Sequence, residues 1–346
     1  MNLRGALCVG LSMACAFAVD VEAQVKARTG GDYVFTGDID LGAPGFWDYA
    51  VFDADAHRLY VGHVDKITVV DVSTRKVVGT VAPLSDAHGV AIVSSLRKGY
   101  ASSGGDGTLK VFDLGTLRVI KEIAVGEDAD GVIFDPHAHV VIVMIGAAKQ
   151  VVVVDPATDS AIKTVDLPDV PEFAAVDGRG KLYVNLVKTA QLAKVDIGAG
   201  RLDAVWPLDG CKGPHGLAYD AGTDRVFSGC ANRVMAVVDP QTGKGVATIP
   251  IGGYSDDVGL DAKRHRIFSP NGDGTLTVIH ADAKDRYSVE RTIPTFLGGR
   301  SMAVDGSTGE LFVTHGDTRI KSPPGNPLEL RFGWDNAEVA TFLPND

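Results

Sequence analysis

The chain repeats itself with a period of about 42 residues, and this repeat constrains its fold more than any other sequence feature. A short apolar triplet marks each period and ends in Asp in six of its seven copies. The last residues of the triplets are separated by steps of 40 to 44 residues and are Asp53, Val93, Asp135, Asp177, Asp220, Asp261 and Asp305. A second landmark, an apolar run that ends in Asp before a turn, recurs in phase with the first at Asp71, Asp113 and Asp155.

Each period contains four short runs that are rich in Val, Ile, Tyr and Phe and are separated by turn residues. In the third copy these runs span residues 131–134, 140–144, 150–154 and 161–165. Such runs predict β-strands, and the chain shows no helical periodicity. Four strands in a unit of about 40 to 45 residues are typical of a β-propeller blade. The sequence therefore predicts an all-β protein, a seven-bladed β-propeller with four-stranded blades.

The two ends of the chain predict how the ring closes. A strand-like segment at 33–35 precedes the first complete unit, whereas the unit after Asp305 has no obvious fourth strand. We expect the N-terminal strand to join the last blade, because this pairing removes two exposed sheet edges. Residues 317–333, which include Pro323 and Pro324, are interpreted as an insertion in that blade.

The first residues have the features of a secretory signal peptide. One Arg precedes an uncharged stretch at 5–19, which is shorter than the roughly 20 apolar residues needed to span a bilayer. Small residues at 21 and 23 fit a cleavage site after residue 23. We therefore predict a signal peptide at 1–23 and a single propeller domain at 24–346. This organisation indicates a periplasmic or secreted protein without a membrane span.

The cysteines and the net charge narrow the choice of environment and partner. Cys8 and Cys15 lie in the predicted signal peptide, so Cys211 and Cys230 remain and are interpreted as a disulfide of an exported protein. The chain has 33 Lys and Arg against 44 Asp and Glu, a formal net charge of −11. Binding to nucleic acid or to an anionic membrane needs a basic surface, so neither partner is expected.

A specific motif lies within the repeat. It comprises Leu59–His63, Ile67–Asp71 and Lys76–Val81, and its frame recurs at Leu182–Asn185. These residues closely resemble the YVTN-type repeat of the YncE-like periplasmic propellers, and the resemblance extends over all seven units. It implies a seven-bladed fold of the wider WD40-like architecture. Related propellers include ligand-binding proteins, quinoprotein subunits, haem-binding domains and lactonases, so the resemblance implies no single function.

The loop before each innermost strand of a propeller opens on one mouth of the central channel. Every unit has a polar or charged residue at this point, and the ligand-binding candidates are Trp47, Asp48, His88, Asp130, Glu172, His215, Asp256 and Arg300. Imidazole and carboxylate groups that converge on a concave surface suit a small polar ligand or a divalent metal ion. The alternative is that these side chains are simply solvated at a wet channel mouth.

We predict a periplasmic binding or scaffold protein, a monomer, that receives a small ligand or a protein partner in this mouth. The alternative is an enzyme, either a metal-dependent lactonase-like hydrolase or a propeller associated with a redox cofactor. No cofactor is identified by the sequence beyond the divalent metal that these side chains would suit. His88 and His215 lie three blades apart, so a shared metal ion would need a bridging carboxylate such as Asp130 or Glu172.

Overall fold

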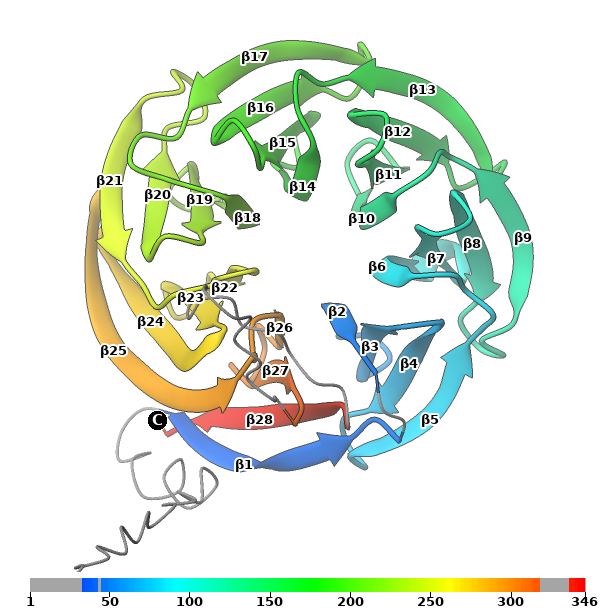
Figure 1. The fold of residues 1–346 in the computed structure, drawn as a ribbon, viewed down its shortest axis with the longest axis horizontal. Coiled ribbons are helices and arrows are strands. Elements are labelled where there is room, and N and C mark those ends of the chain that lie inside the picture. Colours follow the sequence, from blue (N-terminus) through cyan, green and yellow to red (C-terminus); the bar gives the residue numbers. More distant parts are fainter. Residues whose placement is uncertain (1–32, 43–44, 318–335, 346) are drawn as a thin grey trace, which may run out of the picture.

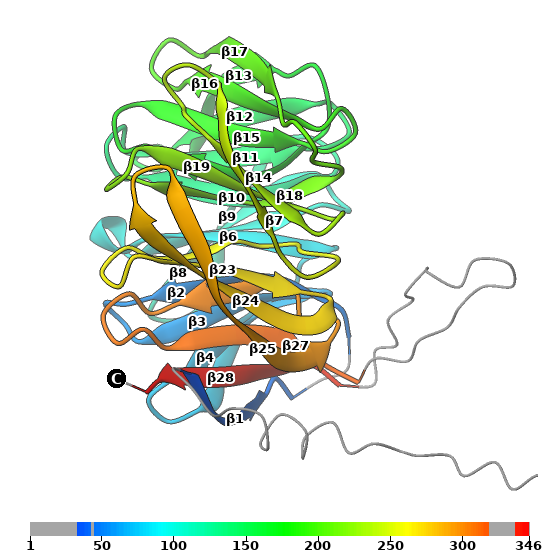
Figure 2. The ribbon, with the colours of Figure 1, turned by 90° about the vertical axis from the view of Figure 1, so that its left-hand side faces the viewer.

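Seven antiparallel sheets of four strands each form a closed ring in the computed structural model, which describes residues 33–42, 45–317 and 336–345 (Figure 1). Within these residues the only helix is the short 3-10 helix η1 (Ser94–Leu96). Figure 2 shows the same ring from its edge. The predicted seven-bladed β-propeller is therefore confirmed. The predicted signal peptide at 1–23, and residues 318–333 of the expected insertion, lie outside the described residues.

The first four blades follow one another along the chain, each built from the centre of the ring outward. The first contains β2 (Trp47–Asp53), β3 (Arg58–His63), β4 (Lys66–Asp71) and β5 (Lys76–Val81). The second contains β6 (Ala87–Val93), β7 (Lys98–Ser103), β8 (Thr108–Asp113) and β9 (Val119–Ala124). The third contains β10 (Ala129–Asp135), β11 (Val140–Ile145), β12 (Gln150–Asp155) and β13 (Ser160–Asp166). The fourth contains β14 (Pro171–Val176), β15 (Lys181–Leu186), β16 (Gln191–Asp196) and β17 (Arg201–Pro207).

The fifth and sixth blades follow the same order, and the seventh combines both ends of the chain. The fifth contains β18 (Pro214–Asp220), β19 (Arg225–Cys230), β20 (Val234–Val238) and β21 (Gly245–Pro250). The sixth contains β22 (Gly259–Asp261), β23 (Arg266–Asn271), β24 (Asp273–Ala283) and β25 (Arg286–Leu297). The seventh contains β26 (Met302–Val304), β27 (Leu311–His315), β28 (Glu338–Pro344) and β1 (Tyr33–Asp40).

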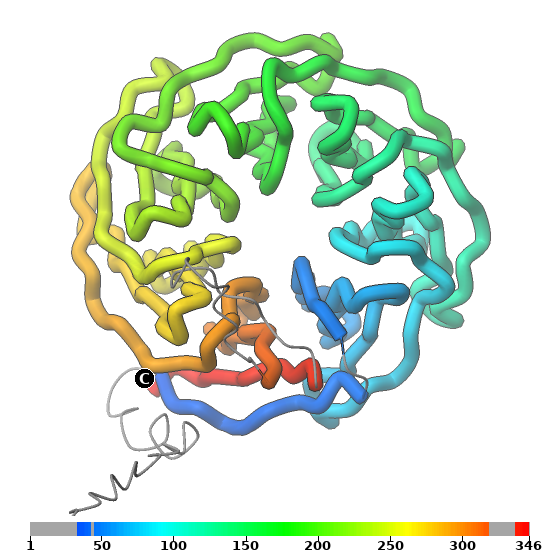
Figure 3. Tube along the Cα trace, in the orientation of Figure 1, coloured from blue at the N-terminus to red at the C-terminus, as the bar shows by residue number. Residues whose placement is uncertain are grey.

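The ring closes through the pairing of β1 with β28, as the sequence predicted. The two strands are antiparallel, and their register runs from Tyr33 opposite Pro344 to Asp40 opposite Glu338. Figure 3 shows these two segments, blue and red, side by side at the rim of the ring. The N-terminal strand thus supplies the outermost strand of the last blade, and the pairing removes an open edge.

The hydrophobic core lies between the blades. Seven buried clusters occur among the described residues, and each joins side chains from two neighbouring blades. The cluster between blades 4 and 5 also contains Tyr49 of blade 1. The cluster between blades 6 and 7 contains Tyr33 of β1 and Phe342 of β28, so the closing strands contribute to the core as well as to the sheet. The core therefore surrounds the channel, and one cluster extends across it through Tyr49.

Phe342 provides a test of this closure. Its ring is fully buried and lies 5.6 Å from that of Phe35 on β1, whereas the next residue, Leu343, is 39 % exposed. We expect Phe342→Ala to lower the free energy of unfolding by about 3 to 5 kcal/mol, because it leaves a cavity between two blades. Leu343→Ala is the matched control and should cost less than about 1 kcal/mol. Equal costs in urea denaturation would contradict the proposed role of the closing strands.

Candidate functional site

One position of the repeat carries an ionisable side chain in all seven blades. It lies five residues before the end of the apolar triplet and is occupied by Asp48, His88, Asp130, Glu172, His215, Asp256 and Arg300. In blades 1 to 5 it falls in a β-bulge, where the pairing of the inner strand with its neighbour shifts register. Such bulges re-aim side chains. Because the seven inner strands surround the axis of the ring (Figure 1), the same position in each blade lies at the same end of the channel. We call these residues the charged ring.

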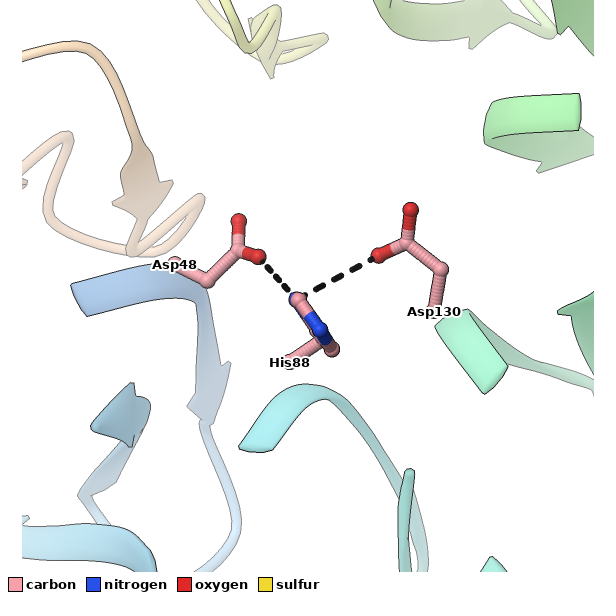
Figure 4. Close-up of side chains that lie close together, drawn as sticks. All are labelled: Asp48, His88 and Asp130. Atoms are coloured by element: carbon pink, nitrogen blue, oxygen red, sulfur yellow. Dashed lines mark hydrogen bonds and ion pairs between the residues drawn. The ribbon is translucent and has the colours of Figure 1, made fainter. Parts of the chain in front are cut away.

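Blades 1 to 3 contribute the first triad of the ring, Asp48, His88 and Asp130. The Nδ1 atom of His88 donates a hydrogen bond to Oδ2 of Asp48 at 2.5 Å and lies 3.8 Å from Oδ1 of Asp130. Figure 4 shows the imidazole between the two carboxylates, which come from the inner strands on either side of it. The Nε2 atom of His88 lies 3.3 Å from Oδ2 of Asp86, whose side chain is largely exposed.

Blades 4 to 6 contribute a second triad with the same order of residue types, Glu172, His215 and Asp256. The Nδ1 atom of His215 lies 3.2 Å from Oε1 of Glu172 and also 3.2 Å from Oδ1 of Asp256. The other oxygen of Asp256, Oδ2, lies 3.2 Å from Nε of Arg300, the ring residue of blade 7. In each triad one donor atom per residue lies within 4.8 Å of the others.

The structure brings seven of the eight candidate residues together and places Trp47 elsewhere. Trp47 is 2 % exposed and belongs to the hydrophobic cluster between blades 7 and 1, where its ring lies against Gly316. Trp47 is the last residue in regular pairing before the bulge, opposite His63, and its indole therefore packs in the core instead of facing the channel. The two histidines occupy separate triads, Asp130 lying beside His88 and Glu172 beside His215.

An aromatic pair lies next to the charged ring. Tyr49 and Phe173 are the residues that follow Asp48 and Glu172, and their rings stack at a centroid distance of 4.2 Å. They come from blades 1 and 4, so the contact crosses the channel. Since the inner strands lead away from the mouth, the pair lies one residue deeper than the ring and forms its floor. Both residues are at most 9 % exposed.

The hydroxyl of Tyr49 is buried and has no hydrogen-bond partner among the described residues. An ideal Cβ on Gly131, the residue after Asp130, would lie 2.9 Å from this oxygen, which places the hydroxyl beside the ring. Burial, together with the charges of Asp130 and Glu172, raises the pKa of Tyr49 well above its usual range, so the phenol keeps its proton. An unpaired buried hydroxyl is costly, and such groups need an explanation.

The ring residues alter one another's pKa. Burial opposes the protonation of His88, but its hydrogen bond to Asp48 and the nearby carboxylate charges outweigh burial and raise its pKa to about 10. Burial opposes the protonation of His215 too, and the hydrogen bond with Glu172 raises its pKa above the usual value. Burial and the charges of Glu172 and Asp48 raise the pKa of Asp130 well above its usual range. The imidazolium of His88 thus offsets the repulsion between the carboxylates of Asp48 and Asp130.

Small residues and backbone hydrogen bonds hold the bulges in place. A Cβ on Gly216, the residue after His215, would come within 2.2 Å of the backbone of Asp257, so only glycine allows blades 5 and 6 to approach this closely. The carboxylate of Asp257 accepts hydrogen bonds from the backbone N–H groups of Val258 and Met302, which joins blade 6 to blade 7. Burial raises the pKa of Asp257 to about 7 despite these bonds.

The segment that carries His215 is fixed from two sides. The side-chain amide of Asn185, from blade 4, donates hydrogen bonds to the carbonyl oxygens of His215 at 2.7 Å and of Gly216 at 3.0 Å. The predicted disulfide between Cys211 and Cys230 is present, with a Cα–Cα distance of 5.5 Å, and Cys230 pairs with Pro214. His215 is therefore presented by a rigid support, as binding and catalytic sites require.

Comparisons with known proteins identify the fold. No protein-family model and no curated protein sequence matches the chain. Among solved structures, a chain of hydrazine synthase from Kuenenia stuttgartiensis is 17 % identical, with a TM-score of 0.67 over 77 % of this chain and 91 % of that one. U3-55K is 11 % identical, with a TM-score of 0.74 over 89 % and 98 % of the two chains. The WD40 repeats of RRP9 are 12 % identical, with a TM-score of 0.74 over 90 % and 97 %.

Fold and site together define a seven-bladed β-propeller, WD40-like in architecture, with a charged channel mouth. At these low identities the likeness to solved structures shows the fold alone. In the described part of the chain, no helix is long and apolar enough to cross a membrane.

Sequence reasoning missed Tyr49 and Phe173, although the repeat contained a signal for them. The same position is Gly89, Gly131 and Gly216 in three other blades, so two aromatic residues there stand out once the units are aligned. The contact between them could not be found in this way, because it depends on which blades lie opposite each other across the channel.

The disulfide provides a test of the support around His215. The bridge closes a loop between residues 19 positions apart, so replacing both cysteines by Ser should lower the free energy of unfolding by about 3 kcal/mol. Urea denaturation of the double variant and of the reduced wild type measures this loss. Unchanged stability in both would contradict a structural role for the bridge.

The raised pKa of His88 gives a pH dependence with a definite sign. The folded value of about 10 exceeds that of an unperturbed imidazole, about 6.5. The contribution of His88 protonation to stability is therefore fully present below about pH 6.5 and is lost as the pH rises through about 10. NMR at pH 8, with the resonance assigned from His88→Gln, should show a protonated ring. A neutral ring at pH 7 would contradict the proposed ion pair.

Proposed function

We propose that this protein is an exported propeller of the YVTN-repeat type that binds a small polar ligand in the mouth of its channel. The family assignment rests on the motif at Leu59–His63 and its recurrence at Leu182–Asn185, which form β3 and most of β15. The export assignment rests on the signal-like N-terminus and is consistent with the bridge between Cys211 and Cys230.

The observation that supports the binding role is the charged ring together with the aromatic pair next to it. The buried hydroxyl of Tyr49 in this pair has no partner among the described residues. Every blade supplies an ionisable side chain to one ring, although the core between the blades does not involve these groups. The Tyr49 hydroxyl lies beside the ring, so a ligand that donates or accepts a hydrogen bond there would supply the partner that it lacks among the described residues. Convergent polar groups in a concave site are the usual form of a small-molecule site.

The composition of the ring limits the ligand. Four carboxylates face two imidazoles and one guanidinium, and the aromatic pair offers little exposed surface. A ligand that carries positive charge or several hydrogen-bond donors fits such a ring better than an apolar molecule. A protein partner would have to insert a side chain of this chemistry into the mouth.

A lactonase-like hydrolase is the second candidate. The observation in its favour is that each triad combines an imidazole with two carboxylates, which could supply metal ligands and a general base. The test is hydrolysis of a simple γ-lactone. Hydrolysis by the wild type that is lost in the ring variants described next would show that the ring catalyses a reaction as well as binding a ligand.

Native mass spectrometry tests the binding role. The protein is purified from its own compartment without chelator and incubated with the low-mass fraction of the culture. We expect a defined mass adduct on the wild type that is lost, or bound at least about tenfold more weakly, in the His88→Gln/His215→Gln double variant, because both triads then lose their central group.

His280→Gln is the matched control. His280 also forms an imidazole–carboxylate pair, 2.9 Å from Asp282, but it lies on β24 outside the ring. This variant should keep the adduct. An adduct retained by the ring double variant, or the absence of an adduct on the wild type, would overturn the proposed function.

A further inference from the structure

We propose that Glu172, His215 and Asp256 form a binding site for one divalent transition-metal ion, with Zn²⁺ as the best-suited ion. This inference rests on the proposed ligand site and specifies its ligand class. The three residues come from the inner strand or its preceding loop in blades 4, 5 and 6. One imidazole and two carboxylates are donors that Zn²⁺ accepts, with a fourth position left for water.

The spacing of the donor atoms carries the proposal. The Nδ1 atom of His215 lies 3.2 Å from Oε1 of Glu172 and 3.2 Å from Oδ1 of Asp256. Donors that each lie about 2.0 to 2.2 Å from a tetrahedral or octahedral ion are separated by about 3.0 to 3.5 Å. Both separations from the ring nitrogen of His215 therefore match those around a bound ion, and the two carboxylate oxygens lie within 4.8 Å of each other.

The first triad differs in this respect, although it too combines one histidine with two acidic residues. Its imidazole lies 2.5 Å from Asp48 and 3.8 Å from Asp130. This uneven spacing is that of a strong hydrogen bond to one carboxylate, with the other carboxylate further away. We therefore assign the metal ion to the second triad and the ion pair to the first.

Neighbouring residues orient the second triad. Arg300 lies 3.2 Å from Oδ2 of Asp256, which leaves Oδ1 facing His215. Asn185 fixes the backbone of His215 through the carbonyl groups at 215 and 216, and Ser228 in turn donates a hydrogen bond to Asn185. Metal ligands are commonly oriented by such surrounding groups.

An independent observation indicates a ligand within the charged ring, next to this triad. The hydroxyl of Tyr49 is buried and has no partner among the described residues, and its ring stacks on Phe173, the neighbour of Glu172. The carboxylate charges of the ring act on this hydroxyl, that of Asp130 most strongly and those of Glu172, Asp48 and Asp256 after it. A hydrated ion in the ring brings water molecules, which are suitable partners for a phenol.

Isothermal titration with Zn²⁺ and with Mg²⁺, on the mature protein without a histidine tag and after EDTA treatment, tests the proposal. We expect one Zn²⁺ per chain and at least tenfold weaker binding of Mg²⁺, because Mg²⁺ prefers oxygen donors and is reluctant to lose its water. His215→Ala and the isosteric Glu172→Gln should each weaken Zn²⁺ binding by at least about 100-fold.

The exposed pair of His280 and Asp282 supplies the control, and His280→Ala should bind Zn²⁺ as the wild type does. Circular dichroism and thermal melting establish that each variant is folded. Glu172→Gln tests the site while the imidazole of His215 stays in place. Failure of the wild type to bind Zn²⁺, full binding by His215→Ala, or equal affinity for Mg²⁺ would each overturn the metal site.

This experiment separates the metal site from the proposed function. One outcome is a protein that takes up no Zn²⁺ and still carries a mass adduct that survives EDTA. That result would reject the metal site but would leave the proposed ligand binding in the ring intact. The absence of both the adduct and Zn²⁺ uptake would reject both proposals.

Discussion

The pairing of β1 with β28 fixes the position of every inner strand, because the seven blades hold one another only as a closed ring. Neighbouring blades share a hydrophobic cluster at each interface, so opening the ring at one interface leaves apolar faces exposed on both sides. Arg75 in blade 1 strengthens the join through a hydrogen bond to the carbonyl of Thr36 on β1. Closure thus couples the two ends of the chain to the geometry at the centre.

Closure also forces equivalent side chains of all seven blades towards one axis. A ring made only of carboxylates would be destabilised by repulsion, and the order acid, histidine, acid in blades 1 to 3 and again in blades 4 to 6 relieves it. Arg300, in the blade left over, pairs with Asp256. The alternation of charge is therefore a requirement of the site, since the core between the blades would form without it.

The two triads share their residue types but differ in spacing, and this difference separates their proposed roles. His88 is held mainly by one carboxylate, whereas His215 lies at equal distances from two. The three solved structures compared above share the fold at 11 to 17 % identity, so their likeness to this chain accounts for neither arrangement. The ring and the unpaired Tyr49 hydroxyl are the features of this chain that point to a ligand.

The sequence by itself determined the number of blades, the closure by the N-terminal strand and the disulfide, because period, strand content and cysteine number are local properties of the chain. It also placed seven of the eight candidates in one ring, because residues at the same position of the repeat occupy equivalent places in their blades. Only the tertiary structure sorted these residues into two triads, stacked Tyr49 on Phe173 across the channel and buried Trp47 between two blades. Those contacts depend on the direction each bulge gives a side chain and on which blades face each other, and neither is encoded in the spacing of residues along the chain.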